Sequence, residues 1–148
     1  EVYGSDISRR VLTMARRAEY GPSALRATSA DLLERFFVPA GNTKVRVRDD
    51  VRAMVSFGHH NLLDEAGSQL VMKMDAVFCR NVMIYFDQSA RRKVLRILRD
   101  RLVPGGYLLL GHSENLLNLG ADFELVHLRG ALVYRRPELP GLVGGEVR

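Results

Sequence analysis

The feature that most constrains the fold is a run of mostly apolar residues, Met74–Cys79, that does not alternate between apolar and polar positions. A strand with one solvated face alternates, whereas a central parallel strand is covered on both faces. A helix follows, capped by Asp87 or Ser89, and residues 104–106 (PGG) turn the chain into another buried strand over 107–111. The helix's apolar stripe comprises Ala90, Val94, Leu95, Ile97, Leu98 and Leu102. Strand, helix, strand predicts a parallel βαβ unit.

The N-terminal third predicts a second strand-to-helix step and two further short strands. Residues 2–6 read as a strand, and Ser8 caps a helix that Gly21-Pro22 stops. Residues 44–48 alternate with period two, and 54–57 form a further strand. The first helix would bury Val11, Leu12, Met14, Ala15 and Ala18.

A second short helix is predicted between these segments. Thr28 and Asp31 have capping-box spacing, apolar Leu32, Leu33, Phe36 and Phe37 follow, and Pro39 with Gly41 ends the helix. Near the C-terminus, residues 123–128 and 131–135 read as an antiparallel hairpin. The fold class predicted is α/β, a doubly wound Rossmann-like sheet with an antiparallel C-terminal hairpin. Residues 138–148 are rich in Pro and Gly and are expected to form a flexible tail.

Composition excludes several kinds of site. Cys79 is the only cysteine, which excludes an intramolecular disulfide and any multi-cysteine metal site, suits a reducing cytoplasm, and leads us to expect no metal. No apolar run reaches the roughly 18 residues of a membrane span, so we expect no membrane insertion. The net charge of +5 is spread over several segments, which fits solvated helix faces as well as an acidic partner.

In an open parallel sheet, ligands bind beyond the carboxyl ends of the strands, so the residues after each strand are the candidates. Asp6 could accept hydrogen bonds from both hydroxyls of a ribose, or act only as a helix cap. Asn61 and Leu62 could flank an adenine ring. The adjacent His59 and His60 suggest a metal site. Neighbouring side chains on extended backbone point apart, however, so we do not expect these two to bind one metal ion.

Polar Arg80 and Asn81 lie between the central strand and an apolar turn, a placement that costs stability unless a partner such as a charged ligand satisfies them. Cys79 has no activating base nearby and is expected to be a buried structural thiol. Tyr85 fits either the core or a substrate-facing position. Residues 112–115 (HSEN) fit either a turn or a pocket wall at the same sheet edge.

Four segments together resemble the CheR-type chemotaxis receptor methyltransferase family. They are residues 4–8 (GSDIS), 57–63 (FGHHNLL), 78–86 (FCRNVMIYF) and 104–114 (PGGYLLLGHSE), which occur in the family's order and spacing. The likeness covers about residues 3–135. The third segment is long and specific, whereas the PGG turn is shared by many methyltransferases.

The resemblance implies transfer of a methyl group from S-adenosylmethionine to glutamate side chains of chemoreceptor cytoplasmic domains, leaving S-adenosylhomocysteine. By position, Asp6 would hold the ribose, Asn61 and Leu62 the adenine region, and Arg80 and Asn81 the reactive end of the cofactor. The resemblance further implies that Tyr85 positions the acceptor glutamate. Residues 33–55 would form a small antiparallel subdomain within a catalytic domain over 1–137. Its Arg46 and Arg48 would pair with an acidic receptor peptide.

The resemblance also implies a helical domain, a first strand and a Gly-containing cofactor loop before Glu1. We therefore expect the 148-residue chain by itself to bind cofactor weakly and to have little activity. Micromolar or tighter binding of S-adenosylhomocysteine in calorimetry would contradict this expectation. An uncovered strand edge would also favour self-association.

Two other functions stay open. A nucleic-acid methyltransferase would share the fold and the positive charge. The Asp/Asn-Pro-Pro-aromatic and Pro-Cys motifs of such enzymes are absent from the strand that ends at Cys79, so we expect no nucleic-acid partner. The chain could instead be a binding module of a larger signalling protein, which the sequence before Glu1 would reveal.

Overall fold

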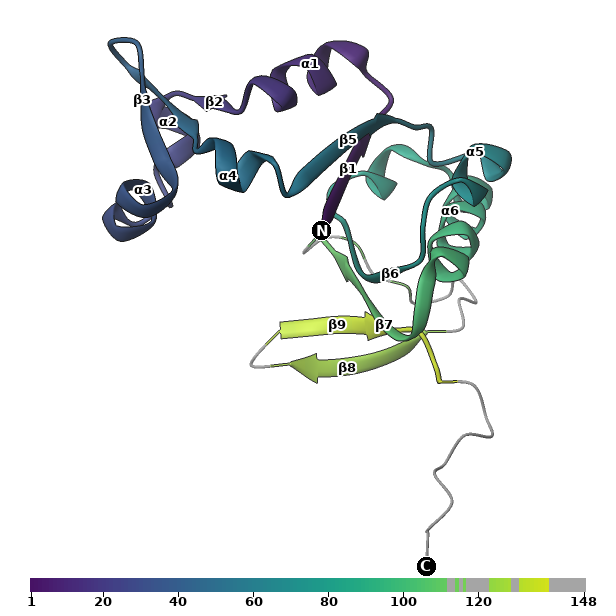
Figure 1. The fold of residues 1–148 in the computed structure, drawn as a ribbon. Coiled ribbons are helices and arrows are strands. Elements are labelled where there is room, and N and C mark those ends of the chain that lie inside the picture. The colour runs from purple at the N-terminus through teal and green to yellow at the C-terminus, as the bar shows by residue number, and fades with distance from the viewer. Residues whose placement is uncertain (112–113, 115, 117–122, 129–130, 139–148) are drawn as a thin grey trace, which may run out of the picture. The chain divides into compact units, whose positions relative to one another are not determined.

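Strands alternate with helices in the computed structural model, which describes residues 1–111, 114, 116, 123–128 and 131–138 (Figure 1). The chain divides into two units, called here unit 1 (Glu1–Asn61) and unit 2 (Leu62–Arg148). In the described residues, no helix combines the length and the apolar character that a membrane crossing requires.

Unit 1 contains a parallel strand pair and a small antiparallel sheet. The parallel pair, β1 with β5, runs in register from Val2 opposite Val55 to Asp6 opposite His59. The antiparallel sheet has the strand order β2-β4-β3. The elements in chain order are β1 (Val2–Asp6), α1 (Arg9–Arg17), β2 (Glu19–Tyr20), α2 (Pro22–Leu25), α3 (Ala30–Phe36), β3 (Phe37–Ala40), β4 (Lys44–Val47), α4 (Asp49–Arg52) and β5 (Val55–His59).

The predicted start of α1 is confirmed, but its end is not where the sequence placed it. The Ser8 side chain accepts a hydrogen bond from the Val11 N–H and so caps the helix. The helix stops at Arg17, because Ala18 adopts a left-handed conformation with φ 53°. The following residues pair as β2 with β4 instead of continuing to Gly21.

The second predicted helix is shifted. Its cap is Ser29, whose side chain accepts from the Leu32 N–H, so the assignment of Thr28 as the cap was wrong. Phe37 leaves the helix in extended conformation and pairs with Val47, which places Pro39 within strand β3. An edge strand accommodates proline, which has no N–H to donate, at a position whose nitrogen faces away from the ladder. The predicted strands over 44–48 and 54–57 are observed as β4 and β5, with slightly different ends.

Unit 2 contains one mixed four-stranded sheet with the order β6-β7-β9-β8. Strands β6 and β7 are parallel, and β9 is antiparallel to both β7 and β8. The predicted hairpin is confirmed, while its turn, Arg129-Gly130, and the tail beyond Glu138 lie outside the described residues. The elements are α5 (Glu65–Gln69), β6 (Met74–Cys79), the 3-10 turn η1 (Met83–Tyr85), α6 (Gln88–Arg101), β7 (Leu102–Leu110), β8 (Glu124–Leu128) and β9 (Ala131–Arg135).

The core of unit 2 lies between α6 and one face of this sheet. Asp87 caps α6 by accepting from the Ala90 N–H, as predicted. Four residues of the predicted apolar stripe are buried on α6, namely Val94, Leu95, Ile97 and Leu98. Ala90 is only half-buried, and Leu102, predicted in the helix, begins strand β7 instead. The most completely buried side chains are Val94, Leu95, Leu102 and Leu108.

Strand β6 differs from the prediction that both of its faces are covered. It stands at one end of the strand order, and Phe78 is 72% exposed. Its partner in register, Leu109, is half-buried, whereas Cys79 on the opposite face is buried in the α6 core. In the part of the chain described, β6 is therefore covered on its α6 side at Cys79, and its opposite face is open at Phe78.

The PGG segment lies inside β7 and shifts its pairing. Met74 faces Leu102, whereas Ala76, two residues on, faces Tyr107, five residues on. Gly105 makes this possible with φ 78°, a region that other residues rarely adopt. Two main-chain hydrogen bonds join the displaced backbone to Arg136. Gly105 N–H donates to the Arg136 carbonyl (3.0 Å), and Arg136 N–H donates to the Gly106 carbonyl (2.8 Å).

Candidate functional site

Asp6 ends strand β1 in unit 1, at the carboxyl edge of the parallel β1–β5 pair. Its half-buried carboxylate accepts from the Ser8 N–H through Oδ1 at 2.7 Å. Its carbonyl oxygen accepts from the His60 N–H at 3.1 Å, which fixes Asp6 relative to the segment after β5. Within the described residues, no hydrogen bond to Oδ2 is recorded. Asp6 thus has one oxygen in the turn and one available for a ligand, so it fits both predicted roles.

Asn61 follows strand β5 in the same unit and is exposed. Since the carboxyl ends of two parallel strands meet at one edge, the structure brings Asn61 and Asp6 to the same edge of the pair. His59 and His60 lie at this edge as well. Among the residues described, no three His, Cys, Asp or Glu side chains group as a metal site would require.

Arg80, Asn81 and Tyr85 lie on one loop of unit 2, residues 80–86, directly after strand β6. All three are exposed, and Tyr85 is 81% exposed. The phenol therefore points to solvent and not into the core, which resolves one alternative that the sequence left open. Asn81 has φ 59°, a left-handed conformation that asparagine tolerates better than most residues. Leu62, at the start of unit 2, is half-buried against the unit 2 core.

Two charged side chains hold this loop by its backbone. The Glu114 carboxylate accepts four main-chain hydrogen bonds, through Oε1 from Val82 (3.0 Å) and Met83 (2.8 Å) and through Oε2 from Asn81 (2.7 Å) and Gly111 (2.8 Å). From α6, Arg91 Nε donates to the carbonyl oxygens of Met83 and Phe86, both at 2.9 Å. The negative charge of Glu114 thus holds N–H groups of the loop, and the positive charge of Arg91 holds carbonyl groups of the same loop.

Burial by itself would raise the pKa of Glu114, but the four backbone N–H groups outweigh it, so the pKa lies below its usual 4.5. Glu114 is therefore ionised at neutral pH. Its charge also acts on Cys79 across the loop. Burial, with a smaller contribution from the Glu114 charge, raises the pKa of the Cys79 thiol to about 11.

Cys79 is 5% exposed and protonated at neutral pH, so it is a structural thiol and not a nucleophile. We expect native Cys79 to react with iodoacetamide at pH 8 more than tenfold slower than an exposed cysteine, because the thiolate is scarce and covered. Urea-unfolded protein, assayed by mass spectrometry in parallel, is the control and should react at the ordinary rate. Equal rates for native and unfolded protein would contradict this assignment.

Arg46 and Arg48 occupy different positions from those expected. Arg46 is on β4, with its guanidinium 3.9 Å from Asp49. Arg48 was predicted on the same strand, but it follows the strand as the residue before helix α4. Its guanidinium grips Asp50 with two bonds of 3.1 and 3.0 Å and donates to the Arg35 carbonyl. Any acidic partner would have to compete with these local contacts.

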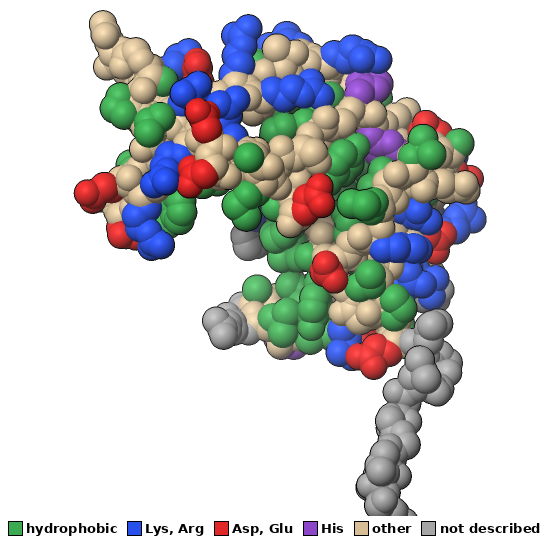
Figure 2. Space-filling view, viewed as in Figure 1, with side chains coloured by type: hydrophobic (Ala, Val, Ile, Leu, Met, Phe, Trp, Pro, Cys, Tyr) green, Lys and Arg blue, Asp and Glu red, His purple; other side chains and the backbone are tan. Residues whose placement is uncertain are grey.

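Four further arginines of unit 1 lie on α1, where Figure 2 shows a group of basic side chains. Arg9, Arg10 and Arg17 are exposed there. Arg16 donates to the Phe57 carbonyl at 2.8 Å, so it fastens α1 to β5. The solvated helix face expected from the sequence accounts for this charge.

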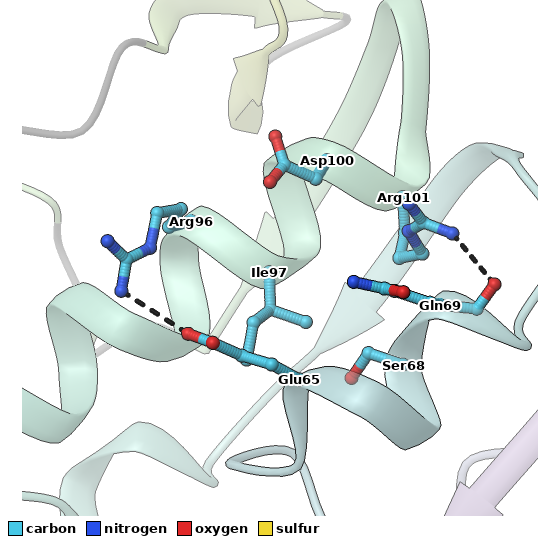
Figure 3. A pocket seen from close by; sticks show the side chains of 7 residues that line it. All are labelled: Glu65, Ser68, Gln69, Arg96, Ile97, Asp100 and Arg101. Atoms are coloured by element: carbon cyan, nitrogen blue, oxygen red, sulfur yellow. Dashed lines mark hydrogen bonds and ion pairs between the residues drawn. The ribbon is translucent and has the colours of Figure 1, made fainter.

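A hollow of about 340 Å³ opens between α5 and α6, away from the predicted residues (Figure 3). Its polar groups bond one another: Arg96 pairs with Glu65 at 3.4 Å, and Arg101 donates to the Gln69 carbonyl at 3.2 Å. None of the candidate residues named above lines it. The hollow is a surface groove between two helices and adds nothing to the site.

Sequence reasoning missed the roles of Glu114 and Arg91. Glu114 was noted only as part of a polar loop, and Arg91 only as one charge of a helix face. A carboxylate shortly after the Tyr107–Leu110 stretch, at the same sheet edge as Arg80, was the available signal. The spacing alone does not show that its partners are main-chain groups.

Comparison with known proteins gives consistent findings. Residues 1–132 match the sequence model of a family described as CheR methyltransferase, SAM binding domain. The chain is 40% identical over 135 residues to the chemotaxis protein methyltransferase of Vibrio parahaemolyticus, covering 90% of the chain and 48% of that protein. It is 38% identical over 136 residues to chemotaxis protein methyltransferase 1 of Pseudomonas aeruginosa, with 91% and 49% coverage. The chain spans about half the length of the curated relatives it matches.

A solved structure, the N-methyltransferase NodS from Bradyrhizobium japonicum, superposes with a TM-score of 0.54. Its sequence identity is 13%, and the match covers 92% of this chain and 73% of that one. This likeness concerns the fold alone. It confirms the predicted α/β methyltransferase fold class.

Proposed function

The chain belongs to the CheR methyltransferase family, whose matched segment is the S-adenosylmethionine-binding domain, and from this premise we propose that the protein methylates glutamate side chains of chemoreceptors. The products are a glutamate methyl ester and S-adenosylhomocysteine, and the process served is adaptation in bacterial chemotaxis. The observation that carries the proposal is the loop 80–86, which holds Arg80, Asn81 and Tyr85 exposed on a braced backbone directly after strand β6.

The residues of each unit fit parts of the cofactor. In unit 1, Asp6 offers a carboxylate oxygen beyond its bond to Ser8, which suits the ribose hydroxyls. Asn61, at the same strand edge, and the next residue, Leu62, suit the adenine region by hydrogen bonding and packing. In unit 2, Arg80 and Asn81 would contact the methionine end.

The reaction asks little of the protein beyond positioning. S-adenosylmethionine supplies an activated methyl group on its sulfonium, and an ionised glutamate is already a nucleophile. Tyr85 would hold the acceptor carboxylate by donating from its exposed phenol. Correct in-line placement can lower the activation barrier by several kcal/mol, since well-oriented reactants gain about 7 kcal/mol or more in intramolecular reactions. Cys79 takes no part, since its thiol is buried and protonated.

The test is a transfer assay with methyl-labelled S-adenosylmethionine and the complete protein that the gene encodes. Chemoreceptor cytoplasmic fragments, tRNA and DNA are offered in parallel. Label should enter the receptor fragment and be released as methanol in mild base, because esters are base-labile and methylated amines are not. Base-stable label, or label in nucleic acid, would overturn the proposal.

For the partner surface, the proposal is that an acidic receptor peptide docks on the subdomain over residues 33–55, at Arg46 and Arg48. A double substitution, Arg46→Ala with Arg48→Ala, should weaken peptide binding in calorimetry. The double substitution Arg9→Ala with Arg10→Ala is the matched control, because it removes two exposed arginines of unit 1 that lie outside this subdomain. Equal binding by both variants would contradict this surface.

Three further assignments belong to the same proposal. The catalytic domain extends over 1–137, the protein works in the cytoplasm, and an uncovered strand edge favours self-association of the isolated chain. Limited proteolysis tests the first, because a fragment over 1–137 should resist cleavage. Cell fractionation tests the second. Light scattering of the isolated chain tests the third, and a strictly monomeric chain would contradict it.

A further inference from the structure

The chain crosses from strand β6 to η1 on a segment that has little support of its own. Asn81 is left-handed, and Val82 is turned toward the helical region with φ −114° and ψ −44°. Three successive N–H groups, those of Asn81, Val82 and Met83, point to one place, and Glu114 fills that place with its carboxylate. Such a concave row of N–H groups is an anion site, here occupied by the protein's own side chain.

We propose that Glu114 is a positioning residue for the reaction, which sets the backbone course of residues 80–83 and thereby the places of Arg80 and Asn81. All four hydrogen bonds that Glu114 accepts come from main-chain N–H groups, so Glu114 acts through the backbone and not through the side chains of Arg80 and Asn81. This inference rests on the proposed function for what Arg80 and Asn81 do, but the geometry of the carboxylate stands by itself.

The fourth donor, Gly111 N–H, joins the end of β7 to the same carboxylate. Gly111 is buried, and a Cβ placed on it would lie 2.4 Å from Asn81 Oδ1 and 2.7 Å from Glu114 Oε2. The close approach of the two strand ends therefore depends on glycine here. Glu114 and Gly111 both hold the same loop. Substitutions at the two positions should therefore have the same effect on it.

The first test is Glu114→Gln, which keeps the size of the side chain. An amide has one acceptor oxygen, so one pair of N–H groups keeps its partner and the other pair faces an NH₂ donor. We expect binding of S-adenosylhomocysteine by the complete protein to weaken about tenfold, because even a misplacement of about 1 Å in positioning groups can cost as much as about a hundredfold in rate. Glu124→Gln is the matched control, because Glu124 pairs with Arg135 on the sheet and should leave binding unchanged.

The second test is Gly111→Ala, which keeps the charge of Glu114 but crowds both Asn81 Oδ1 and Glu114 Oε2, and so displaces the loop from its carboxylate. It should weaken binding at least as much as Glu114→Gln. Amide hydrogen exchange supplies a readout independent of cofactor: residues 81–83 should lose protection in both variants while Leu95 and Leu108 in the core keep theirs. If Glu114→Gln fails to fold, the titration of the unaltered protein described next decides the matter.

The third test needs no substitution. Because the folded-state pKa of Glu114 is depressed, its stabilisation is present above pH 4.5 and is lost as the pH falls through the folded value. The amide shifts of residues 81, 82, 83 and 111 should therefore titrate together, with a midpoint below 4.5. Four independent titrations, or none, would overturn the proposal.

The two levels of the argument fail in different ways. If the unaltered protein does not bind S-adenosylhomocysteine, the proposed function fails while the exchange and titration results still judge the loop. If the unaltered protein binds and both variants bind equally well, Glu114 is not a positioning residue.

Discussion

Replacing Gly106 by alanine is expected to lower the free energy of unfolding by about 3 kcal/mol, as overpacking of a buried site does. A Cβ on Gly106 would lie 2.9 Å from the Val103 carbonyl oxygen and 3.0 Å from that of Asp75. Both are backbone atoms, so they cannot move aside without disturbing the β6–β7 pairing or the bond from Arg136. Urea unfolding followed by circular dichroism measures the change.

Two other glycine substitutions separate the effect of crowding from that of backbone strain. Gly105→Ala meets only the Glu138 side chain at 3.7 Å but must hold φ 78°, and should cost about 1–2 kcal/mol. Gly21→Ala meets nothing within 4 Å and should cost less than about 1 kcal/mol. An alanine at 106 that is tolerated as well as one at 21 would contradict the close approach of β6 and β7.

The second large effect is expected at Asp6. Asp6→Ala should weaken binding of S-adenosylhomocysteine by about a hundredfold or more, because it removes charge-assisted hydrogen bonds to two ribose hydroxyls. Asp6→Asn keeps an oxygen for the Ser8 N–H and loses one charged acceptor, so a smaller loss of about tenfold is expected. Isothermal titration of the complete protein measures both.

Ser8→Ala is the control for Asp6, because it removes the cap of the same helix without touching the carboxylate. If loss of order at the start of α1 caused the effect, Ser8→Ala would reproduce it. Binding by Asp6→Ala as tight as that of the unaltered protein would show that Asp6 serves the helix turn alone.

The sequence predicted unit 2 closely because its signals are long. The bounds of β6, the Asp87 cap and the middle of the apolar stripe of α6 agree with the structure, whereas the strand predicted over 107–111 begins earlier, at Leu102. A helix of this length has enough periodicity to identify its buried face. The error lay in coverage, since an apolar strand pattern cannot tell which neighbours cover it, and Phe78 is exposed.

The prediction was weaker between Ala18 and Val47 because the elements there are short. Strand β2 and helix α2 were not predicted, since two to four residues carry no period. Phe37 was assigned to a helix because its apolar neighbours fit helical spacing, but strand pairing with β4 prevailed. Tertiary contacts decide such segments.

For the candidate site, the sequence predicted which residues follow each strand. It did not predict the hydrogen bonds that hold those residues in place. Asp6 and Arg80 follow strands whose ends the sequence locates well. The bonds from Glu114 to three successive N–H groups depend on the φ of Asn81, which no local pattern specifies. The roles of all these residues stay predictions until the substitutions above are measured.

The bracing of residues 80–83 has a consequence for sequence change over evolutionary time. Glu114 grips main-chain N–H groups, which every residue but proline possesses, so the fastening does not depend on which side chain stands at position 80. Position 81, by contrast, admits few residues besides asparagine, aspartate and glycine, because of its left-handed backbone. Drift or laboratory selection can therefore change the side chain at position 80 without rebuilding the loop.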